Sequence, residues 1–474
     1  MRIIDQIYIN GQFVTPHGAE VADLINPSNG ELLGQVRLGD VEDAHRAIAA
    51  ARAALPLMAR STLAQRGEWL QRLHDAVLKR AGEAVEAIVR EYGGPIQSAQ
   101  WRVQHAANGF LNAKTTMEQY EFVRTVGKSK VMMEGLGVVG IITPWNASSG
   151  FIGTKLGMAI AAGCTAVIKP SELSAIQTQI LLECLHEAGL PPGVFNIVNG
   201  RGDVVGAELS THPDIAKISF TGSTLVGKGI MRAAADTLKR VTLELGGKSP
   251  NILLDDADLE TAVPLAIRSA FMNNGQACIA GTRLLVPEHQ LERVKALVKA
   301  EAEAVKVGDP HDPAVTLGPL VNRKQWERVQ RYIQLGMEEG AELLTGGPGQ
   351  PQGLEQGYFV KPTVFAGVTP QMTIAKDEIF GPVLAIISYR TEEEAIAIAN
   401  DTTYGLQAYV SSRDVARANR VAEQLQAGRV HINGLHDDMI TPFGGFKQSG
   451  IGREFGPFGL DAYLEPKAIL GPVA

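Results

Sequence analysis

The sequence predicts an α/β protein whose central domain is a parallel sheet with helices on both faces. The main observation is a series of continuous apolar, β-prone segments at residues 137–145, 165–170, 195–199, 215–222 and 241–245. Helical patterns separate them, near residues 150–161, 174–188, 203–210 and 224–236. Uninterrupted apolar strands that alternate with helices are typical of parallel sheets covered on both faces. The 51 glycines suit the many tight turns of this class.

The chain on the N-terminal side of this domain is predicted to form scaffold. Residues 7–13 suit a strand, a turn and the start of a second strand, and helical spacing follows at 41–55 and 61–91. Gly-Gly-Pro at 93–95 ends the helical region. Residues 118–136 mix β-branched and charged side chains around one glycine, as in a plain surface hairpin or a protruding two-stranded ribbon.

A second α/β unit is predicted over residues 251–447. Its helical patterns lie near residues 256–272, 290–306, 323–339, 392–400 and 414–426. Its predicted strands lie near residues 283–287, 383–389 and 428–432. Two units agree with the length, because 474 residues exceed one ordinary hydrophobic core.

Composition excludes several classes of protein. The formal net charge is −7 and no long basic run occurs, which argues against nucleic acid as a partner. No segment approaches the ~20 apolar residues of a membrane span, and the N-terminus lacks the apolar core of a signal peptide. Cys164, Cys184 and Cys278 are widely spread, without zinc or disulfide spacing, so we expect no metal and a reducing, cytoplasmic location.

Two motifs carry chemistry. Cys278 follows Gly-Gln-Ala, and a cysteine thiolate is a strong nucleophile, although most free cysteines are simply small buried residues. Glu244 lies in an apolar β-prone run that ends in two glycines. If this carboxyl is buried, its pKa rises toward the range of a general base at neutral pH. A nucleophilic cysteine and such a base suit a covalent acyl intermediate and its hydrolysis.

With these motifs, the sequence resembles the NAD(P)-dependent aldehyde dehydrogenases along essentially its whole length. Leu-Glu244-Leu-Gly-Gly-Lys and Gly-Gln-Ala-Cys278 match the two family signatures, and segments 378–382, 400–406 and 442–454 are further matches. We interpret the last segment mainly as glycine-rich packing. The resemblance implies an aldehyde dehydrogenase-like fold, with a parallel-sheet cofactor domain, an α/β catalytic domain and a small β arm for oligomerisation.

The resemblance also implies domain boundaries and an assembly. Residues 1–117 and 137–246 would form the dinucleotide-binding domain, and residues 247–447 the catalytic domain. Segments 118–136 and 455–474 would join subunits into a homodimer or homotetramer.

The implied reaction oxidises a small-molecule aldehyde to a carboxylic acid. Cys278 attacks the aldehyde, Asn146 and the Cys278 N–H hold the oxyanion, and NAD accepts the hydride. Glu244 then activates the water that hydrolyses the thioester, and Lys155 has a supporting role. Alternatives are a CoA-acylating or semialdehyde-specific member, a catalytically idle NAD-binding oligomer, and a thiol hydrolase. Glu244 argues against CoA acylation, and no histidine motif supports a thiol hydrolase.

The cofactor is expected at strand ends. Residues 220–227 place glycines and hydroxyls at a strand-to-helix turn, which suits a phosphate or a plain N-cap, and no GxGxxG fingerprint occurs. By resemblance, Ser223 contacts the pyrophosphate, and Lys169 and Glu172 hold the adenosine ribose. Glu172 would repel a 2′-phosphate, which favours NAD over NADP. The expected set is Thr143, Pro144, Trp145, Lys169, Ser171, Glu172, Thr221, Gly222, Ser223, Gly227, Leu245, Glu378 (nicotinamide ribose) and Phe380 (nicotinamide).

The substrate tunnel departs from the family pattern. After Asn146 many relatives carry Phe-Pro, whereas this chain has Ala147 and a serine, and Thr154 stands where an aromatic residue is common. Acidic residues at 437–438 would disfavour an anionic tail, unless that loop is merely solvated. We therefore expect a neutral aldehyde of medium or bulky size, aromatic ones included. The expected lining is Ala147, Phe151, Thr154, Ala277, Ile279, His436 and Met439.

Overall fold

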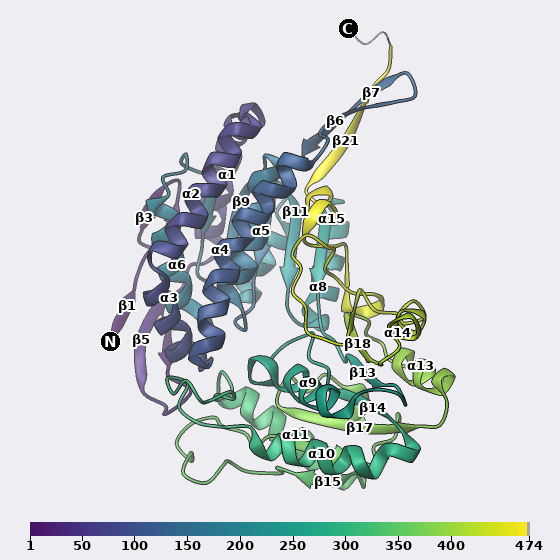
Figure 1. The fold of residues 1–474 in the computed structure, drawn as a ribbon. Helices are drawn as coiled ribbons and strands as arrows, with labels where there is room; N and C mark the ends of the chain where they lie inside the picture. The colour runs from purple at the N-terminus through teal and green to yellow at the C-terminus, as the bar shows by residue number, and fades with distance from the viewer. Residues whose placement is uncertain (472–474) are drawn as a thin grey trace.

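The computed structural model describes residues 1–471 as two large sheets and a projecting arm (Figure 1). The first sheet has the strand order β20-β12-β11-β8-β9-β10-β2-β3. Its five central strands are parallel and confirm the predicted series: β8 (Val138–Ile142), β9 (Thr165–Lys169), β10 (Phe195–Ile197), β11 (Ile215–Thr221) and β12 (Arg240–Glu244). Antiparallel strands close the edges: β2 (Ile7–Ile9), β3 (Gln12–Val14) and β20 (Gly450–Ile451).

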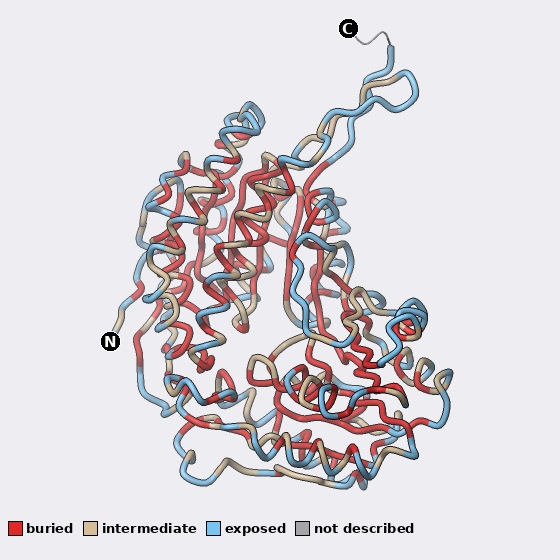
Figure 2. Tube along the Cα trace, in the orientation of Figure 1, coloured by how far each residue is buried: buried red, intermediate tan, exposed pale blue. Residues whose placement is uncertain are grey.

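Helices cover both faces of this sheet, as the uninterrupted apolar strands predicted. Val138 and Val139 are both buried, but they belong to different core clusters on opposite faces. One face is packed by α1 (Val41–Arg60), α7 (Ala207–Thr211) and α8 (Thr224–Ala235). The other is packed by α2 (Leu63–Lys79), α4 (Ile96–Gln119), α5 (Ser148–Ala162) and α6 (Ala175–Glu187). Figure 2 shows the resulting buried layers.

The second sheet has the order β15-β16-β17-β14-β13-β18-β19. Its strands are β13 (Pro250–Leu253), β14 (Arg283–Pro287), β15 (Glu342–Thr345), β16 (Thr363–Ala366), β17 (Val383–Tyr389), β18 (Gln407–Ser411) and β19 (Arg429–Ile432). One face carries α9 (Leu259–Phe271) and α10 (Leu291–Ala304). The other carries α11 (Arg323–Glu338), α13 (Glu392–Asn400) and α14 (Val415–Ala422). The short strands β13, β15, β16 and β18 were not predicted from the sequence.

The arm is a three-stranded antiparallel sheet of β6 (Val123–Val126), β7 (Ser129–Gly135) and β21 (Leu464–Ile469), preceded by α15 (Gly456–Asp461). It extends from the body and is largely exposed (Figures 1 and 2). The predicted ribbon and its pairing with the C-terminal tail are thus confirmed, while its role in oligomerisation stays a prediction. Residues 472–474 of the predicted segment 455–474 lie outside the described residues. At the N-terminus, β1 (Arg2–Ile4), β4 (Val21–Ile25) and β5 (Leu32–Arg37) form a separate small sheet.

Two helical regions differ from the prediction. The helical region at 61–91 is divided into α2, α3 (Ala81–Ala87) and a π-helical turn at Ile88–Tyr92. Most of α4 is not predicted from the sequence, because the buried side of this helix includes Gly109, Thr116 and the charged Arg102, which weaken the apolar periodicity. Glycines let α4 and α5 pack closely, since a Cβ on Gly153 would collide with the Ala106 carbonyl. Among residues 1–471, no helix is long and apolar enough to span a membrane.

Candidate active site

The loop that carries Cys278 is held in an unusual backbone conformation. It follows a short helical turn in which Asn273 and Asn274 have φ of 56° and 58°, and Gly275 has φ of 70°. The Asn274 side chain donates to the carbonyls of Gly93 and Pro319, both at 3.0 Å. A Cβ on Gly247 would collide with the Cys278 carbonyl, so the glycine pair after Glu244 permits this close approach.

Asn146 lies directly beside this loop. It follows β8, and its Nδ2 donates to the Gln276 carbonyl at 2.9 Å, while its own carbonyl accepts from Asn273 Nδ2 at 3.1 Å. The side chain is buried, and it lines, together with Cys278, a cavity of about 420 Å³. The structure therefore brings the predicted amide donor and the predicted nucleophile to one cavity.

Burial raises the pKa of both the Cys278 thiol and the candidate base Glu244. Burial, with the carboxylates of Glu378 and Glu244, raises the pKa of the Cys278 thiol. Glu244 ends β12 and is 2% exposed, and neither of its carboxyl oxygens has a hydrogen-bond partner within residues 1–471. Burial, and next the nearby Glu454, raise its pKa well above the ordinary value. In this conformation Glu244 does not line the 420 Å³ cavity, whereas Glu454 does.

Lys155 forms a buried ion pair with Glu454 and donates to Ser219 Oγ at 3.1 Å. The carboxylate that pairs with Lys155 was not among the predicted site residues, and the supporting role of Lys155 stays a prediction. The available signal was an acidic residue in the glycine-rich segment 442–454, which was interpreted as packing. Lys217 is also buried here, and burial with the charge of Lys155 lowers its pKa to about 7.

A second cavity, of about 440 Å³, opens at the carboxyl ends of β8, β9 and β11. Its lining includes seven of the predicted cofactor residues: Thr143, Pro144, Lys169, Ser171, Glu172, Thr221 and Gly222. Residues that sequence reasoning missed also line it: Gly202, Gly206, Ala207, Ser210, Thr211, Val226, Gly229 and Ile230. Ligands of open parallel sheets bind at such strand ends.

The chemistry of this cavity fits a dinucleotide. The hydroxyls of Thr143 and Thr221 are buried without a partner in the described part of the chain, so both are free for a ligand. A Cβ on Gly229 would meet no atom within 4 Å, which leaves open space along α8. Lys169 Nζ lies 3.4 Å from Glu172, and its pKa is lowered mainly by burial.

The other predicted cofactor residues lie outside that lining. Ser223 is the N-cap of α8, and its Oγ accepts from the Val226 N–H at 3.4 Å. Gly227 and Leu245 pack α8 against the end of β12, since a Cβ on Gly227 would lie 2.5 Å from the Leu245 side chain. The structure shows this packing contact for both residues, and their cofactor role stays a prediction.

Trp145, Glu378 and Phe380 form a separate group. The rings of Trp145 and Phe380 meet edge to face, with centroids 5.6 Å apart, and Phe380 has φ of 64°. Glu378 accepts from the Gly247 N–H at 3.0 Å, and burial raises its pKa to about 7. These contacts bring Glu378 to the glycine pair that packs on the Cys278 loop.

Six of the seven predicted substrate-lining residues line the 420 Å³ cavity: Ala147, Phe151, Thr154, Ala277, Ile279 and His436. Met439 does not, because it is buried elsewhere and its sulfur accepts a hydrogen bond from Asn112 at 3.0 Å. The missed lining residues include Trp101, Arg102 and His105 of α4. Nδ1 of His105 lies 3.3 Å from Asp437 and its ring stacks on Trp101, with centroids 4.8 Å apart.

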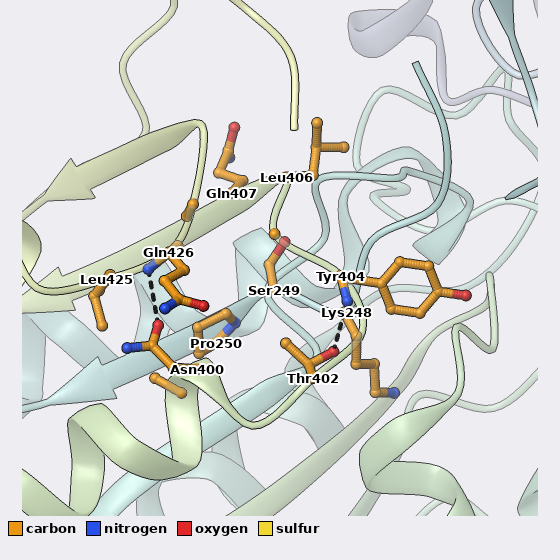
Figure 3. A pocket seen from close by; sticks show the side chains of 14 residues that line it. Lys248, Ser249, Pro250, Asn400, Thr402, Tyr404, Leu406, Gln407, Leu425 and Gln426 are labelled. Atoms are coloured by element: carbon orange, nitrogen blue, oxygen red, sulfur yellow. Dashed lines mark hydrogen bonds between the residues drawn. The ribbon is translucent and has the colours of Figure 1, made fainter. Parts of the chain in front are cut away.

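Figure 3 shows a third, much smaller cavity beside Lys248. Its volume is about 10 Å³, which is room for about one water molecule and excludes a reactant. The Lys248 amine has no partner in the described residues, and burial lowers its pKa to about 7. Farther away, ligating atoms of His45, Glu208 and His212 lie within 4.8 Å of one another at the partly exposed surface between α1 and α7.

Comparisons with known proteins cover the whole chain. Residues 13–469 match the model of the Aldehyde dehydrogenase family. A 3-succinoylsemialdehyde-pyridine dehydrogenase from a Pseudomonas species is 46% identical over 473 residues, which cover 99% of each chain. A mutant of Aldehyde Dehydrogenase C from Pseudomonas syringae, complexed with NAD+ and octanal, superposes with a TM-score of 0.97 at 45% identity, covering 99% of this chain and 98% of that chain. The NAD+ complex of an aldehyde dehydrogenase from Bacillus cereus gives 0.95 at 39% identity, covering 99% and 97%.

Proposed function

The chain belongs to the aldehyde dehydrogenase family, an oxidoreductase family, and we propose that it oxidises a neutral aldehyde to the carboxylic acid with NAD. The observation that carries this proposal is the placement of Cys278 and Asn146 at one cavity. Glu244 is close enough to raise the pKa of Cys278, and it is buried without a hydrogen-bond partner within residues 1–471. A second cavity with the chemistry of a dinucleotide site lies at the ends of the neighbouring strands.

The first step is attack of the Cys278 thiolate on the aldehyde carbon. The Asn146 amide and the Cys278 N–H stabilise the oxyanion of the thiohemiacetal. Loss of one such donor costs roughly 3–4 kcal/mol of transition-state stabilisation. NAD, when bound, supplies the hydride acceptor, and Cys278 then carries a thioester. A raised thiol pKa makes proton removal from Cys278 part of this step.

Hydrolysis of the thioester is assigned to Glu244. Its raised pKa, and the absence of a hydrogen-bond partner in the described part of the chain, suit a carboxylate that accepts a proton from water. The water attacks the thioester carbon, and the carboxylic acid and the Cys278 thiol are released. Lys155 and Glu454 have a positioning role beside this step, because their ion pair fixes a charged wall of the cavity.

The preference for NAD rests on Glu172. Glu172 lines the cofactor cavity, so its carboxylate would repel the 2′-phosphate of NADP. Glu172 also pairs with Lys169, which is the cation that could otherwise bind that phosphate. Thr143, Thr221 and the N-terminus of α8 would hold the remaining polar groups of the cofactor.

The preference for an aldehyde of medium or bulky size rests on the small side chains Ala147 and Thr154 in the cavity wall. The preference for a neutral aldehyde rests on the acidic Asp437, which lines the same cavity. The octanal complex of the Pseudomonas syringae neighbour supports an uncharged substrate of medium length. The exposed β arm supports a homodimer or homotetramer, since an isolated edge of unpaired strands is a ready template for pairing.

The test is NADH formation, with NAD and NADP assayed separately against aliphatic, aromatic and semialdehyde substrates, with and without coenzyme A. Turnover with NAD, release of the free acid and no dependence on coenzyme A are expected. The variant Cys278→Ala should form no NADH. A thioester product of coenzyme A, or turnover by Cys278→Ala, would contradict the proposed mechanism.

A further inference from the structure

Arg102 brings a positive charge into the wall of the substrate cavity without a counter-ion. It lies on α4, is 7% exposed, and lines the same cavity as Cys278. Within residues 1–471, its guanidinium contacts the ring of Tyr92, 4.4 Å from the centroid, and pairs with no carboxylate. A buried charge without a partner is strongly unfavourable, so a protein retains one where something else supplies the partner.

The aromatic contact compensates for only part of this cost. Burial lowers the pKa of Arg102, but a guanidinium stays protonated at neutral pH. Arg429, another guanidinium of the cavity, is satisfied within the fold: it donates to the carbonyls of Asp438 at 2.6 Å and Pro442 at 2.9 Å. Within residues 1–471, Arg102 makes no comparable hydrogen bond, and it lines a cavity that a substrate is expected to enter.

The other groups of the cavity indicate what kind of ligand group could accept a hydrogen bond from Arg102. The Asp437 carboxylate is paired with His105 and does not reach Arg102. Trp101 offers an apolar surface beside it. We propose that Arg102 binds an acceptor oxygen, of a ketone or a carboxylate, on the tail of the aldehyde. The inference rests on the proposed oxidation of an aldehyde in this cavity and names its substrate class: a ketone tail agrees with the neutral aldehyde proposed above, whereas a carboxylate tail would replace it. The planar fork of a guanidinium suits such an oxygen, because it presents two parallel N–H groups.

A purely structural role of Arg102 predicts a different result. The Tyr92 hydroxyl donates to Asn273 Oδ1 at 2.7 Å and accepts from Gln276 Nε2 at 3.0 Å, so Tyr92 supports the loop before Cys278. If Arg102 only supports Tyr92, its replacement will lower kcat/KM for all aldehydes by the same factor. If Arg102 binds the tail, its replacement will lower kcat/KM only for aldehydes that carry an acceptor oxygen.

The test compares three six-carbon aldehydes: hexanal, hexanal with a ketone on its fifth carbon, and adipic semialdehyde. The measured quantity is kcat/KM for each acceptor-bearing aldehyde divided by kcat/KM for hexanal. In Arg102→Met this ratio should fall roughly ten- to hundredfold for the preferred acceptor, mainly through KM, because a hydrogen bond to a charged group is lost. Arg102→Lys, which keeps the charge without the fork, should recover part of the ratio for the carboxylate only. A ratio that is unchanged in Arg102→Met for both acceptors would overturn the inference.

A binding measurement separates this inference from the proposed function. Hexanoate, its ketone-bearing analogue and adipate are titrated into the wild type and Arg102→Met, with tryptophan fluorescence as the readout, since Trp101 lines the cavity. At least one acceptor-bearing acid should bind the wild type more tightly than hexanoate, and Arg102→Met should lose the difference. Equal binding of all three acids by the wild type would overturn the role of Arg102. If the wild type binds an acceptor-bearing acid more tightly than hexanoate but turns over none of the aldehydes, the proposed function is overturned and the role of Arg102 is not. A higher kcat/KM for adipic semialdehyde than for the other two aldehydes would overturn the proposal of a neutral substrate.

Discussion

Replacement of Glu244 by glutamine tests the assignment of the hydrolytic base. The substitution keeps the size of the side chain and removes its ability to accept a proton. Because Glu244 is 2% exposed and has no partner within residues 1–471, the exchange breaks no hydrogen bond or ion pair of the fold. A general base contributes typically 10²–10⁴-fold, so the steady-state kcat should fall by about that factor.

The two halves of the reaction should respond differently. In Glu244→Gln, a rapid-mixing experiment should still show a burst of NADH close to one equivalent per active site, since formation of the thioester does not need the hydrolytic base. In the wild type, kcat should rise with pH up to the raised pKa of Glu244, because only the carboxylate form accepts a proton. Glu244→Gln should lack this rise.

As the pH rises, the stability of the wild type relative to Glu244→Gln should fall, whereas its kcat should rise. Burial raises the pKa of Glu244, so the folded state binds a proton more tightly than the unfolded state. The wild type therefore loses stability relative to Glu244→Gln as the pH rises above the ordinary range of a glutamate, by about 1.4 kcal/mol for each unit of the pKa difference. Thermal unfolding at acidic and neutral pH measures this effect, with the exposed Glu423→Gln as a matched control that should change neither property. An unchanged kcat, or loss of the NADH burst, would exclude Glu244 as the hydrolytic base.

Three further predictions concern other parts of the site. Glu172→Ser should raise kcat/KM for NADP, divided by kcat/KM for NAD, by roughly tenfold, because the substitution removes the like-charge repulsion of the 2′-phosphate. An unchanged ratio in assays of NADH and NADPH formation would contradict the role of Glu172. Asn146→Ala should lower kcat roughly 10²–10³-fold through loss of an oxyanion donor, and a wild-type kcat would exclude that role. Lys155→Met should destabilise the fold by roughly 3–5 kcal/mol in urea unfolding, since it leaves the buried Glu454 without its counter-ion. The double variant Lys155→Met, Glu454→Leu should recover most of that loss, and failure to do so would show that the ion pair is not the cause.

Much of the fold could be read from the sequence, because local patterns carry the information that defines it. All five central strands of the first sheet are at the predicted positions, since strands buried on both faces must be continuously apolar. The family resemblance is confirmed, and with it the aldehyde dehydrogenase-like fold. The predicted residues Asn146 and Cys278 line one cavity: Asn146 follows β8 of the first sheet, and Cys278 precedes β14 of the second.

Local sequence patterns are enough to predict the fold class, the family and the residue types available for the reaction. The partners that surround these residues depend on how distant parts of the chain pack together. Glu454 pairs with Lys155, which is 299 residues away in the chain, and no local pattern reports such a contact. Arg102 interrupts the apolar side of α4 and so weakens the helical pattern in the sequence. Its position in the cavity wall depends on the packing of α4 in the fold. Periodicity records which face of an element is buried, whereas the packing of distant elements determines which charges are left without a partner.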